Sequence, residues 1–412
     1  MLVRAASPRP DEYGGSMVVS RRRLMGGVLG VVGGSLVGGT VAGCSGETIA
    51  SAPTASGSRA PTQAKPSPTG AGSSSASAPT SATPSASATK ARVVWPLTGK
   101  PVTDPTLLRH AAVGVKVPDN RNEHPQVGLD KADIVFVELD GYRDAAGNSG
   151  TRLLPVFHSS MPDAVGPVRS LRPVDVPLLA PMHAIVGNTG GAGWVLNYVE
   201  RHDDYVDGLL SYVNTRGTGA YSIDGSRVRT LSGVKYYDRA VLCHPRKLAR
   251  QSDFTTAPPV PYFPFAANAA TASTASGKRA TTVRVPWQGD GYAMSYAYDA
   301  KSRRYLRSMP WGRHVLANGV RVAPDNVLVI RATQTYEKLV SGRGGVEPVQ
   351  GIVDGKGSFF YFNGGRGVTG TWTKAAVNQP FSFVLDNGTP LAMAPGQTYV
   401  ELVAPRAGVR FS

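Results

Sequence analysis

The sequence has very little cysteine. Its 412 residues include two cysteines, Cys44 and Cys243, which leaves little scope for a disulfide framework. Cys243 is flanked by Val241, Leu242 and His244, and a lone cysteine in such surroundings is more often a small buried residue than a nucleophile. Cys44 follows an apolar N-terminal run, and this position predicts a different role.

The sequence also lacks the short motifs of several enzyme classes. Seven histidines occur without short metal-ligand spacing, and neither H-E-x-x-H nor C-x-x-C is present. The G-x-S-x-G motif of a nucleophile elbow is absent as well. We therefore expect no metal site and no cofactor, and a binding role is favoured over catalysis.

Acidic residues are scarce relative to basic ones. The chain has 44 Lys and Arg residues against 28 Asp and Glu residues, which gives a formal net charge of +16 at pH 7. Such a surplus favours anionic partners, namely envelope polymers, lipid headgroups or nucleic acid. Since no nucleic-acid-binding motif accompanies the charge, we expect an anionic cell-wall polymer as the partner and no nucleic acid.

Residues 1–43 predict an export signal that ends at a lipid-attachment site. Three arginines at 21–23 fit the twin-arginine pattern and precede an apolar, glycine-rich run over 24–41. Val-Ala-Gly directly before Cys44 resembles the lipobox of bacterial lipoproteins, in which the cysteine receives two acyl chains such as palmitate. Two chains suffice for stable membrane anchoring. The sequence leaves open the general export route and a start at Met17.

Residues 44–92 predict a lipidated cysteine followed by a disordered tether. Ser, Ala, Thr, Pro and Gly dominate this stretch, and such a composition buries too little apolar surface to offset the entropy of ordering. As a flexible coil its ends would average roughly 40 Å apart. We therefore expect the folded part to lie outside the cytoplasm, near the outer face of the cytoplasmic membrane.

After the tether the sequence divides into two predicted domains of an α+β protein. Strand and helix patterns alternate over 93–250, which favours a mixed α/β domain. Residues 251–281 are rich in Pro, Ala, Thr and Ser and read as a connection. Strict alternation over 292–299 and turn signals at 386–388 favour a mostly antiparallel β domain over 282–412.

Individual elements are predicted within both domains. Helices are expected over 174–180 and from residue 194. Strands are expected over 111–117, 132–137, 153–157, 184–186, 292–299, 327–330, 359–362, 381–385 and 399–403.

The stretch 126–175 presents the main candidate binding residues. Pro173 disfavours a helical conformation for Arg172, so Arg169 and Arg172 are expected on a stiff loop beside two apolar strands. Forked guanidinium donors suit carboxylate or phosphate groups. Together with Arg152 they predict an anion site. The alternative is internal pairing, with Asp133, Glu138 or Asp175 as partners.

A glycine-rich loop over 187–193 supplies a second part of this candidate site. The loop follows a predicted strand and precedes a predicted helix, and Gly190 and Gly191 lie at its centre. Free N–H groups at a helix start can hold an anion. The spacing matches neither a Walker sequence nor G-x-G-x-x-G, so tight backbone packing without a ligand is the alternative.

Several short stretches of the chain carry a family resemblance. They are Trp95-Pro96-Leu97-Thr98-Gly99, Pro125-Gln126-Val127-Gly128-Leu129, Ala132-Asp133-Ile134-Val135, Thr151-Arg152, Val165-Gly166-Pro167-Val168-Arg169-Ser170-Leu171-Arg172-Pro173, Gly370-Thr371-Trp372-Thr373-Lys374, Asn387-Gly388-Thr389-Pro390 and Pro395-Gly396-Gln397-Thr398-Tyr399-Val400. By these stretches the chain resembles the YerB-like family of bacterial lipoproteins over essentially all of 93–405. This resemblance implies a membrane-anchored extracytoplasmic protein with two family domains and no particular chemistry. One departure is Cys243-His244-Pro245, where family members tend to carry Pro-His-Asn, so any role of that asparagine is in doubt here.

A carboxylate-dependent hydrolase acting on cell-wall glycan is the catalytic alternative. Asp133 and Glu138 would serve as acid and base, aided by His158 or His183. Residues five apart on one strand face opposite sides, so this pair would need a bulge. An envelope assembly protein without a small ligand is the third hypothesis, and the sequence leaves the oligomeric state open.

Overall fold

The computed structural model describes residues 93–412 except 144–148, 238, 255 and 289–290. The predicted signal, Cys44 and the tether lie outside the described residues. Within the described part, no helix combines the length and the apolar character needed to cross a bilayer.

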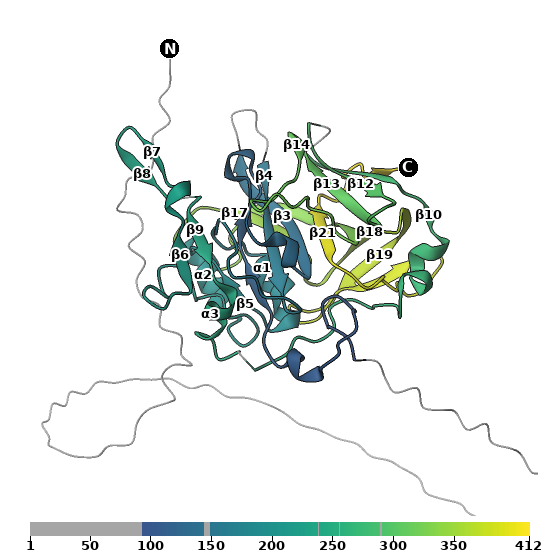
Figure 1. The fold of residues 1–412 in the computed structure, drawn as a ribbon, viewed down its shortest axis with the longest axis horizontal. Coiled ribbons are helices and arrows are strands. Elements are labelled where there is room, and N and C mark those ends of the chain that lie inside the picture. Colours follow the sequence, from purple (N-terminus) through teal and green to yellow (C-terminus); the bar gives the residue numbers. More distant parts are fainter. Residues whose placement is uncertain (1–92, 144–148, 238, 255, 289–290) are drawn as a thin grey trace, which may run out of the picture. The chain divides into compact units, whose positions relative to one another are not determined.

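An eleven-stranded mixed sheet forms the centre of the fold (Figure 1). Nine of its strands follow one another in hydrogen-bonded order, β2 (Val117–Pro118) pairs with β4, and β20 (Ser382–Leu385) pairs with β19. The order is β10 (Lys278–Arg279), β19 (Arg366–Lys374), β18 (Gly355–Asn363), β15 (Asn326–Arg331), β21 (Thr398–Val403), β3 (Ile134–Arg143), β4 (Ser149–Phe157), β1 (Val113–Val115) and β5 (Ile185–Gly187).

Strand β21 joins the two predicted segments of the chain. It pairs in parallel with β3 from the N-terminal part and with β15 from the C-terminal part. The hydrophobic core is likewise shared, since Phe136 and Leu154 belong to the same buried cluster as Val329 and Leu402. Residues 93–250 and 282–412 thus contribute to one sheet and one core.

The sequence of β3 explains its central place. Ile134, Val135, Phe136 and Val137 are all fully buried, because β21 and β4 flank the strand and both faces are covered. A strand covered on both faces reads as a continuous apolar run rather than an alternating one. The apolar run predicted over 132–137 therefore marks the middle of the sheet.

A five-stranded antiparallel sheet lies beside the central one (Figure 1). Burial alternates along β13 and, from residue 294 to 297, along β12, as expected for strands with one solvated face. The inward residues include Tyr296, whose hydroxyl donates to Glu401 of β21 over 2.5 Å. The strand order is β14 (Gly312–Arg313), β13 (Arg304–Met309), β12 (Tyr292–Asp299), β11 (Thr282–Gln288) and β22 (Arg410–Phe411).

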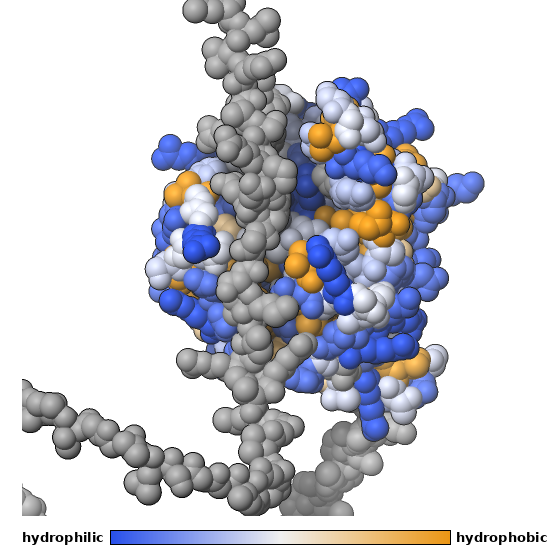
Figure 2. Space-filling view, turned by 90° about the vertical axis from the view of Figure 1, so that its left-hand side faces the viewer, coloured by the Kyte–Doolittle hydropathy of each residue, from blue (hydrophilic) through white to orange (hydrophobic). Residues whose placement is uncertain are grey.

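Three two-stranded sheets and short helices complete the described part. Figure 2 shows the face that carries several of them, where hydrophobic patches lie among hydrophilic side chains. The strand pairs are β16 (Thr333–Glu337) with β17 (Glu347–Gly351), β6 (Tyr221–Ile223) with β9 (Val241–Cys243), and β7 (Arg229–Leu231) with β8 (Val234–Tyr236). The α-helices are α1 (Asp175–Leu179), α2 (Gly193–Glu200) and α3 (Pro245–Ala249). The 3-10 helices are η3 (Pro105–Leu108), η4 (Arg121–Glu123), η5 (Leu129–Lys131), η6 (Ala180–Met182), η7 (Gly225–Arg227), η8 (Ala269–Thr271) and η9 (Ser273–Ser276).

The sheet-rich character that the sequence predicts is confirmed, while the N-terminal part is less helical than an α/β domain. The α-helices α1, α2 and α3 in the described residues span 5, 8 and 5 residues. Proline limits α1, because Pro177 lies within it and Pro181 follows in η6. The turn between β18 and β19 has positive φ at Gly364 and Gly365 (62° and 75°), the geometry that a two-residue hairpin turn requires.

Candidate functional site

Arg152 and Arg172 lie together, as predicted, but they contact a carboxylate of the same chain. Both form ion pairs with Oδ1 of Asp140, and Arg172 donates twice more to the Asp140 backbone oxygen, over 2.7 and 3.0 Å. Glu347 of β17 approaches Nη1 of Arg172 at 3.2 Å. Burial and the neighbouring Arg152 lower the pKa of Arg172 to about 10. The alternative of internal pairing therefore describes Arg172, with Asp140 as the main partner.

Arg169 also has an internal partner. Its guanidinium forms an ion pair with Glu123, and its side chain is 33% exposed. Asn120 donates through Nδ2 to both Glu123 and Asp140, over 3.1 Å each. All three predicted arginines thus belong to one polar network whose acceptors come from the same chain.

A buried ion triad extends this network. Lys116 Nζ lies 2.5 Å from Glu138 Oε2 and 2.7 Å from Asp175 Oδ1, and all three side chains are buried. The second oxygen of Asp175 accepts from the backbone N–H of Arg172 over 2.6 Å. Burial and the nearby Asp175 raise the pKa of Glu138 to about 8 although Lys116 favours its ionised form. Glu138 is therefore held in the interior, away from solvent.

The loop around Gly190 and Gly191 is occupied by the protein itself. Gly190 donates its N–H to Oδ1 of Asn188 over 2.8 Å. At the start of α2, the N–H of Trp194 donates to the backbone oxygen of Arg343 over 3.0 Å. The N–H groups of Gly190 and Trp194 are thus engaged by acceptors of the same chain, although the space beside Gly190 is open.

The four catalytic candidates do not gather in one place. Oδ2 of Asp133 accepts from the backbone N–H groups of His158 and Ser159 over 2.6 and 2.7 Å, which fixes the turn after β4. Burial and a neighbouring histidine lower the pKa of His158 to about 4. His183 is exposed after η6, and among the described residues Asp133 and Glu138 share no hydrogen-bond partner. This geometry does not provide two carboxylates facing one cleft.

Of the two cysteines, the structure describes Cys243 and not Cys44. Cys44, the predicted lipidation site, lies outside the described residues. Cys243 is a free, fully buried thiol in β9, and burial raises its pKa well above the ordinary value. A buried neutral thiol is a poor nucleophile, as its apolar neighbours predict.

A second buried polar cluster was not predicted from the sequence. Arg307 of β13 is fully buried and donates through Nη2 to Asp119 over 2.8 Å and through Nη1 to His314 Nδ1 over 2.7 Å. His314 Nε2 lies 2.9 Å from Gln126 Oε1. Although burial opposes ionisation, Arg307 and His124 hold the pKa of Asp119 below its usual range. The cluster connects the five-stranded sheet to the loop after β2.

The same cluster contains metal-ligand side chains but already holds a cation. Asp119, His124 and His314 place their ligand atoms within 4.8 Å of one another. The guanidinium of Arg307 contacts two of these three residues, so it supplies the positive charge that a metal ion would bring. We therefore assign this cluster a structural role.

A row of polar side chains crosses the outer face of the five-stranded sheet. Arg410 of β22 lies directly opposite Arg284 of β11. The row continues through Ser295 of β12, Ser308 of β13 and Arg313 of β14. Directly paired residues on neighbouring strands share one face, and like charges in this arrangement repel each other. The spacing of these residues along the sequence does not reveal that they lie side by side in the sheet.

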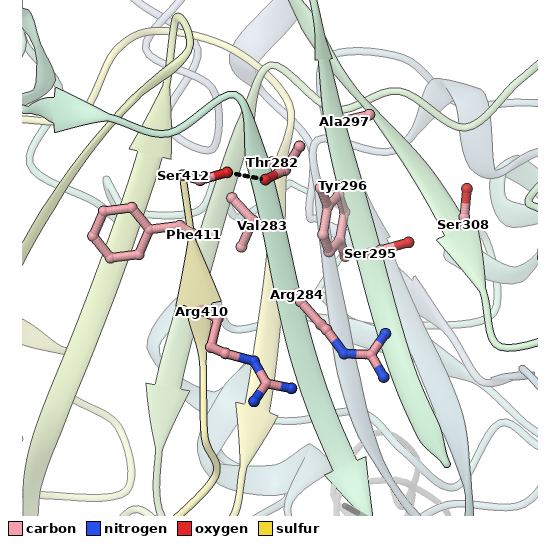
Figure 3. A pocket seen from close by; sticks show the side chains of 10 residues that line it. All are labelled: Thr282, Val283, Arg284, Ser295, Tyr296, Ala297, Ser308, Arg410, Phe411 and Ser412. Carbon is pink, nitrogen blue, oxygen red and sulfur yellow. Dashed lines mark hydrogen bonds between the residues drawn. The ribbon is translucent and has the colours of Figure 1, made fainter. Parts of the chain in front are cut away.

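Four residues of this row line a shallow pocket of about 440 Å³ near the C-terminus, namely Arg284, Ser295, Ser308 and Arg410. Figure 3 shows the Arg284 and Arg410 side chains on neighbouring strands, with Ser295 on the next strand. At one end the hydroxyls of Thr282 and Ser412 lie 2.6 Å apart. Hydroxyl and guanidinium donors that line one open surface are the groups that recognise anionic oxygens.

One further arginine, Arg321, adds positive charge near Arg313 of β14. Arg321 donates through Nη2 to the hydroxyl of Ser308 over 2.8 Å. Partial burial and the nearby positive charge of Arg313 lower the pKa of Arg321 below its ordinary value. Because like charges lie close together here, a bound anion would relieve their repulsion.

The fold is that of a known structure from a bacterial protein. The crystal structure of YerB protein from Bacillus subtilis matches with a TM-score of 0.59, over 77% of this chain and 100% of that chain. The sequence identity in this comparison is 23%. The match establishes the shared fold of a two-part, sheet-rich protein.

Sequence comparison gives the family. Two family models match the chain: the N-terminal domain of a protein of unknown function (DUF3048) over residues 97–229, and the C-terminal domain of the same family over 283–400. The chain is also 28% identical to "Putative lipoprotein YerB" of Bacillus subtilis (strain 168) over 327 residues, which cover 76% of this chain and 87% of that protein. The chain belongs to this two-domain, YerB-like family, as its sequence motifs predict.

Proposed function

We propose that this protein is a lipoprotein of the outer face of the cytoplasmic membrane that binds an anionic component of the cell envelope. Cys44 would carry the lipid, after export by the twin-arginine or the general route. The lipobox-like sequence before Cys44 and the printed name of the related YerB protein support the anchor. The net charge of +16 supports an anionic partner.

The observation that carries the binding proposal is the direct cross-strand pairing of Arg284 with Arg410. We assign binding to this basic face, which we define as Arg284, Arg410, Ser295, Ser308 and Arg313. It replaces the site predicted around Arg152, Arg169 and Arg172, whose guanidiniums are engaged by carboxylates of the chain. Neither Arg284 nor Arg410 is without a partner in the chain, so recognition rests on the summed charge of the face rather than on unpaired donors.

Binding of defined polymers tests the proposal. The purified chain would be titrated with poly(glycerol phosphate), which carries phosphodiesters, and with poly-L-glutamate, which carries carboxylates. We expect salt-sensitive binding to at least one polymer. An Arg284→Gln/Arg410→Gln variant should lose about 2 kcal/mol, or roughly thirtyfold in Kd, at about 1 kcal/mol per surface ion contact.

A matched variant controls for net charge. Arg246→Gln/Arg279→Gln removes two exposed arginines of α3 and β10 and should bind within about twofold of the unmodified chain. Equal losses in both variants would reduce the effect to overall charge and contradict a specific face. Absence of binding to either polymer would refute the proposal.

An envelope assembly protein without a small ligand is the second candidate function. The internal pairing of Arg152, Arg169 and Arg172 favours it, since these residues then stabilise the fold instead of meeting a ligand. The hydrolase alternative has no comparable support, because Asp133 and Glu138 are each engaged in separate interior contacts. The polymer titration distinguishes the first two functions, and release of soluble wall fragments would reinstate the third.

A further inference from the structure

The hairpin formed by β7 and β8 pairs only with itself among the described strands. Its two strands form a separate two-stranded sheet, and Figure 1 shows the hairpin extending beyond β6 and β9, the strands at its base. Ser232 and Gly233 have positive φ (50° and 78°), which closes the strands with a tight two-residue turn. The hairpin is a projecting finger rather than part of a larger sheet.

The base of the hairpin is fixed to the body of the protein. Both terminal nitrogens of Arg227 donate to the backbone oxygen of Pro125 over 3.0 Å. Asp224 forms an ion pair with Arg227 at 3.2 Å. The backbone N–H of Asp224 donates to the backbone oxygen of Ala240 over 2.8 Å. These contacts at the base of the hairpin therefore set its orientation.

The tip of the hairpin exposes apolar side chains. Leu231 and Val234 lie directly opposite each other next to the turn and are 52% and 55% exposed. Tyr236 ends β8 and Tyr237 follows it, and they are 39% and 47% exposed. An exposed aliphatic tip with tyrosines one step behind it is the arrangement found at membrane interfaces, where tyrosine occupies the headgroup level.

Positive charge surrounds this apolar tip. Residues 228–237, which form the hairpin, contain Arg229 and Lys235 and no acidic residue, a net charge of +2. The guanidinium of Arg229 lies 5.9 Å from the ring centre of Tyr236. Basic residues close to a bilayer are attracted to anionic lipid headgroups. Charge and apolar exposure thus point to the same occupant.

We propose that the β7–β8 hairpin docks on an anionic lipid bilayer. Leu231 and Val234 enter the headgroup region, Tyr236 and Tyr237 lie at its level, and the basic side chains meet lipid phosphates. This inference goes beyond the proposed anion recognition, since it concerns another surface and another partner. It rests on the proposed anchor in one respect, because a lipid on Cys44 would keep the folded part near the same bilayer.

Tryptophan quenching by brominated lipid tests this proposal in the full chain. A Leu231→Trp variant keeps the tip apolar and adds a fluorescent reporter. The control variant Val353→Trp places the same reporter at a valine that is 40% exposed in the turn before β18. The chain would be bound to vesicles with brominated phosphatidylglycerol or brominated phosphatidylcholine. On phosphatidylglycerol we expect at least about twofold stronger quenching at position 231 than at 353.

Charge variants in the Leu231→Trp background separate the two contributions. Arg229→Gln/Lys235→Gln should weaken vesicle binding by about fivefold per charge, while Arg246→Gln/Arg279→Gln should leave the quenching unchanged. The basic-face variant Arg284→Gln/Arg410→Gln should also leave it unchanged, so failure of the anion proposal is distinguishable from failure of this one.

Three results would overturn membrane docking by the hairpin. One is equal quenching at positions 231 and 353. Another is equal quenching on neutral and anionic lipid, since the basic residues would then have no role. The third is a change in emission only when native envelope proteins are added to the vesicles, which would assign the hairpin to a protein partner.

Discussion

Replacing Lys116 with methionine is expected to destabilise the protein severely. Methionine preserves most of the side-chain volume but removes the ammonium that lies 2.5 Å from Glu138 and 2.7 Å from Asp175. Both carboxyl groups are buried, so water cannot replace the lost contacts. The substitution therefore tests whether the triad between β3 and α1 holds the interior together.

The magnitude follows from the cost of leaving a buried carboxylate unpaired. Removal of one partner of a buried ion pair typically costs about 3–5 kcal/mol, a large part of the roughly 5–15 kcal/mol that stabilises a native domain. Protonation limits the loss, because the pKa of Glu138 is already raised to about 8. We therefore expect Lys116→Met to lower the free energy of unfolding by about 3 kcal/mol at pH 7.

Urea denaturation at pH 7, followed by tryptophan fluorescence, measures this loss. A Lys100→Met control removes a lysine that is 48% exposed and lies 3.5 Å from Asp325, and it should cost less than about 1 kcal/mol. The double variant Lys116→Met/Glu138→Leu should recover part of the stability, since one of the two buried carboxyl groups is gone. A loss in Lys116→Met no greater than that of the control would refute the reasoning.

Three further predictions concern other parts of the chain. The pKa of Glu138 in the folded protein is about 8, above the ordinary 4.5, so its contribution to stability is present below pH 4.5 and is lost as the pH rises through 8. The free energy of unfolding, obtained from urea titrations at pH 5 to 8, should fall accordingly, by up to about 1.4 kcal/mol per pH unit, and Glu138→Gln should flatten this slope; a slope unchanged in the variant would contradict the assignment. Arg307→Met should cost about 3–5 kcal/mol by leaving Asp119 buried without its guanidinium, whereas Arg304→Met on the exposed side of the same strand should cost less than about 1 kcal/mol; calorimetry compares the two, and equal losses would count against the buried cluster. Cys44→Ala should prevent lipid attachment and shift the protein from the membrane fraction to the soluble fraction, as fractionation and acyl labelling would measure; continued labelling would exclude Cys44 as the site.

Each of the nine strands that local patterns predicted coincides with a strand of the structure, while twelve of the 22 strands in the described residues, among them β11 and β19, were not predicted. The apolar run over 132–137 corresponds to β3, and the alternating stretch over 292–299 corresponds to β12. These patterns are reliable because a strand buried on one face alternates between apolar and polar residues, whereas a strand buried on both faces is a continuous apolar run. The helices predicted over 174–180 and from residue 194 correspond to α1 and α2, whereas α3 was not predicted, since a helix of five residues carries little periodicity.

The candidate site was harder to predict for a different reason. Arg169 and Arg172 have the chemistry of an anion site, and the sequence left both ligand binding and internal pairing open. The decisive partner, Asp140, lies at the far end of β3, and Glu347 comes from a hairpin in the other half of the chain. Sequence distance gives no information about which carboxylate a buried guanidinium will meet.

By itself the sequence determined the family, the places of the nine predicted strands, the surplus of positive charge and the lipobox-like position of Cys44. Each of these depends on neighbouring residues or on composition. Tertiary structure alone decided that β21 joins both halves of the chain in one sheet, that Arg284 and Arg410 face each other, and that the β7–β8 hairpin projects with an apolar tip. These features depend on strand register and packing between distant segments, because the free energy of burial selects partners in space rather than along the chain.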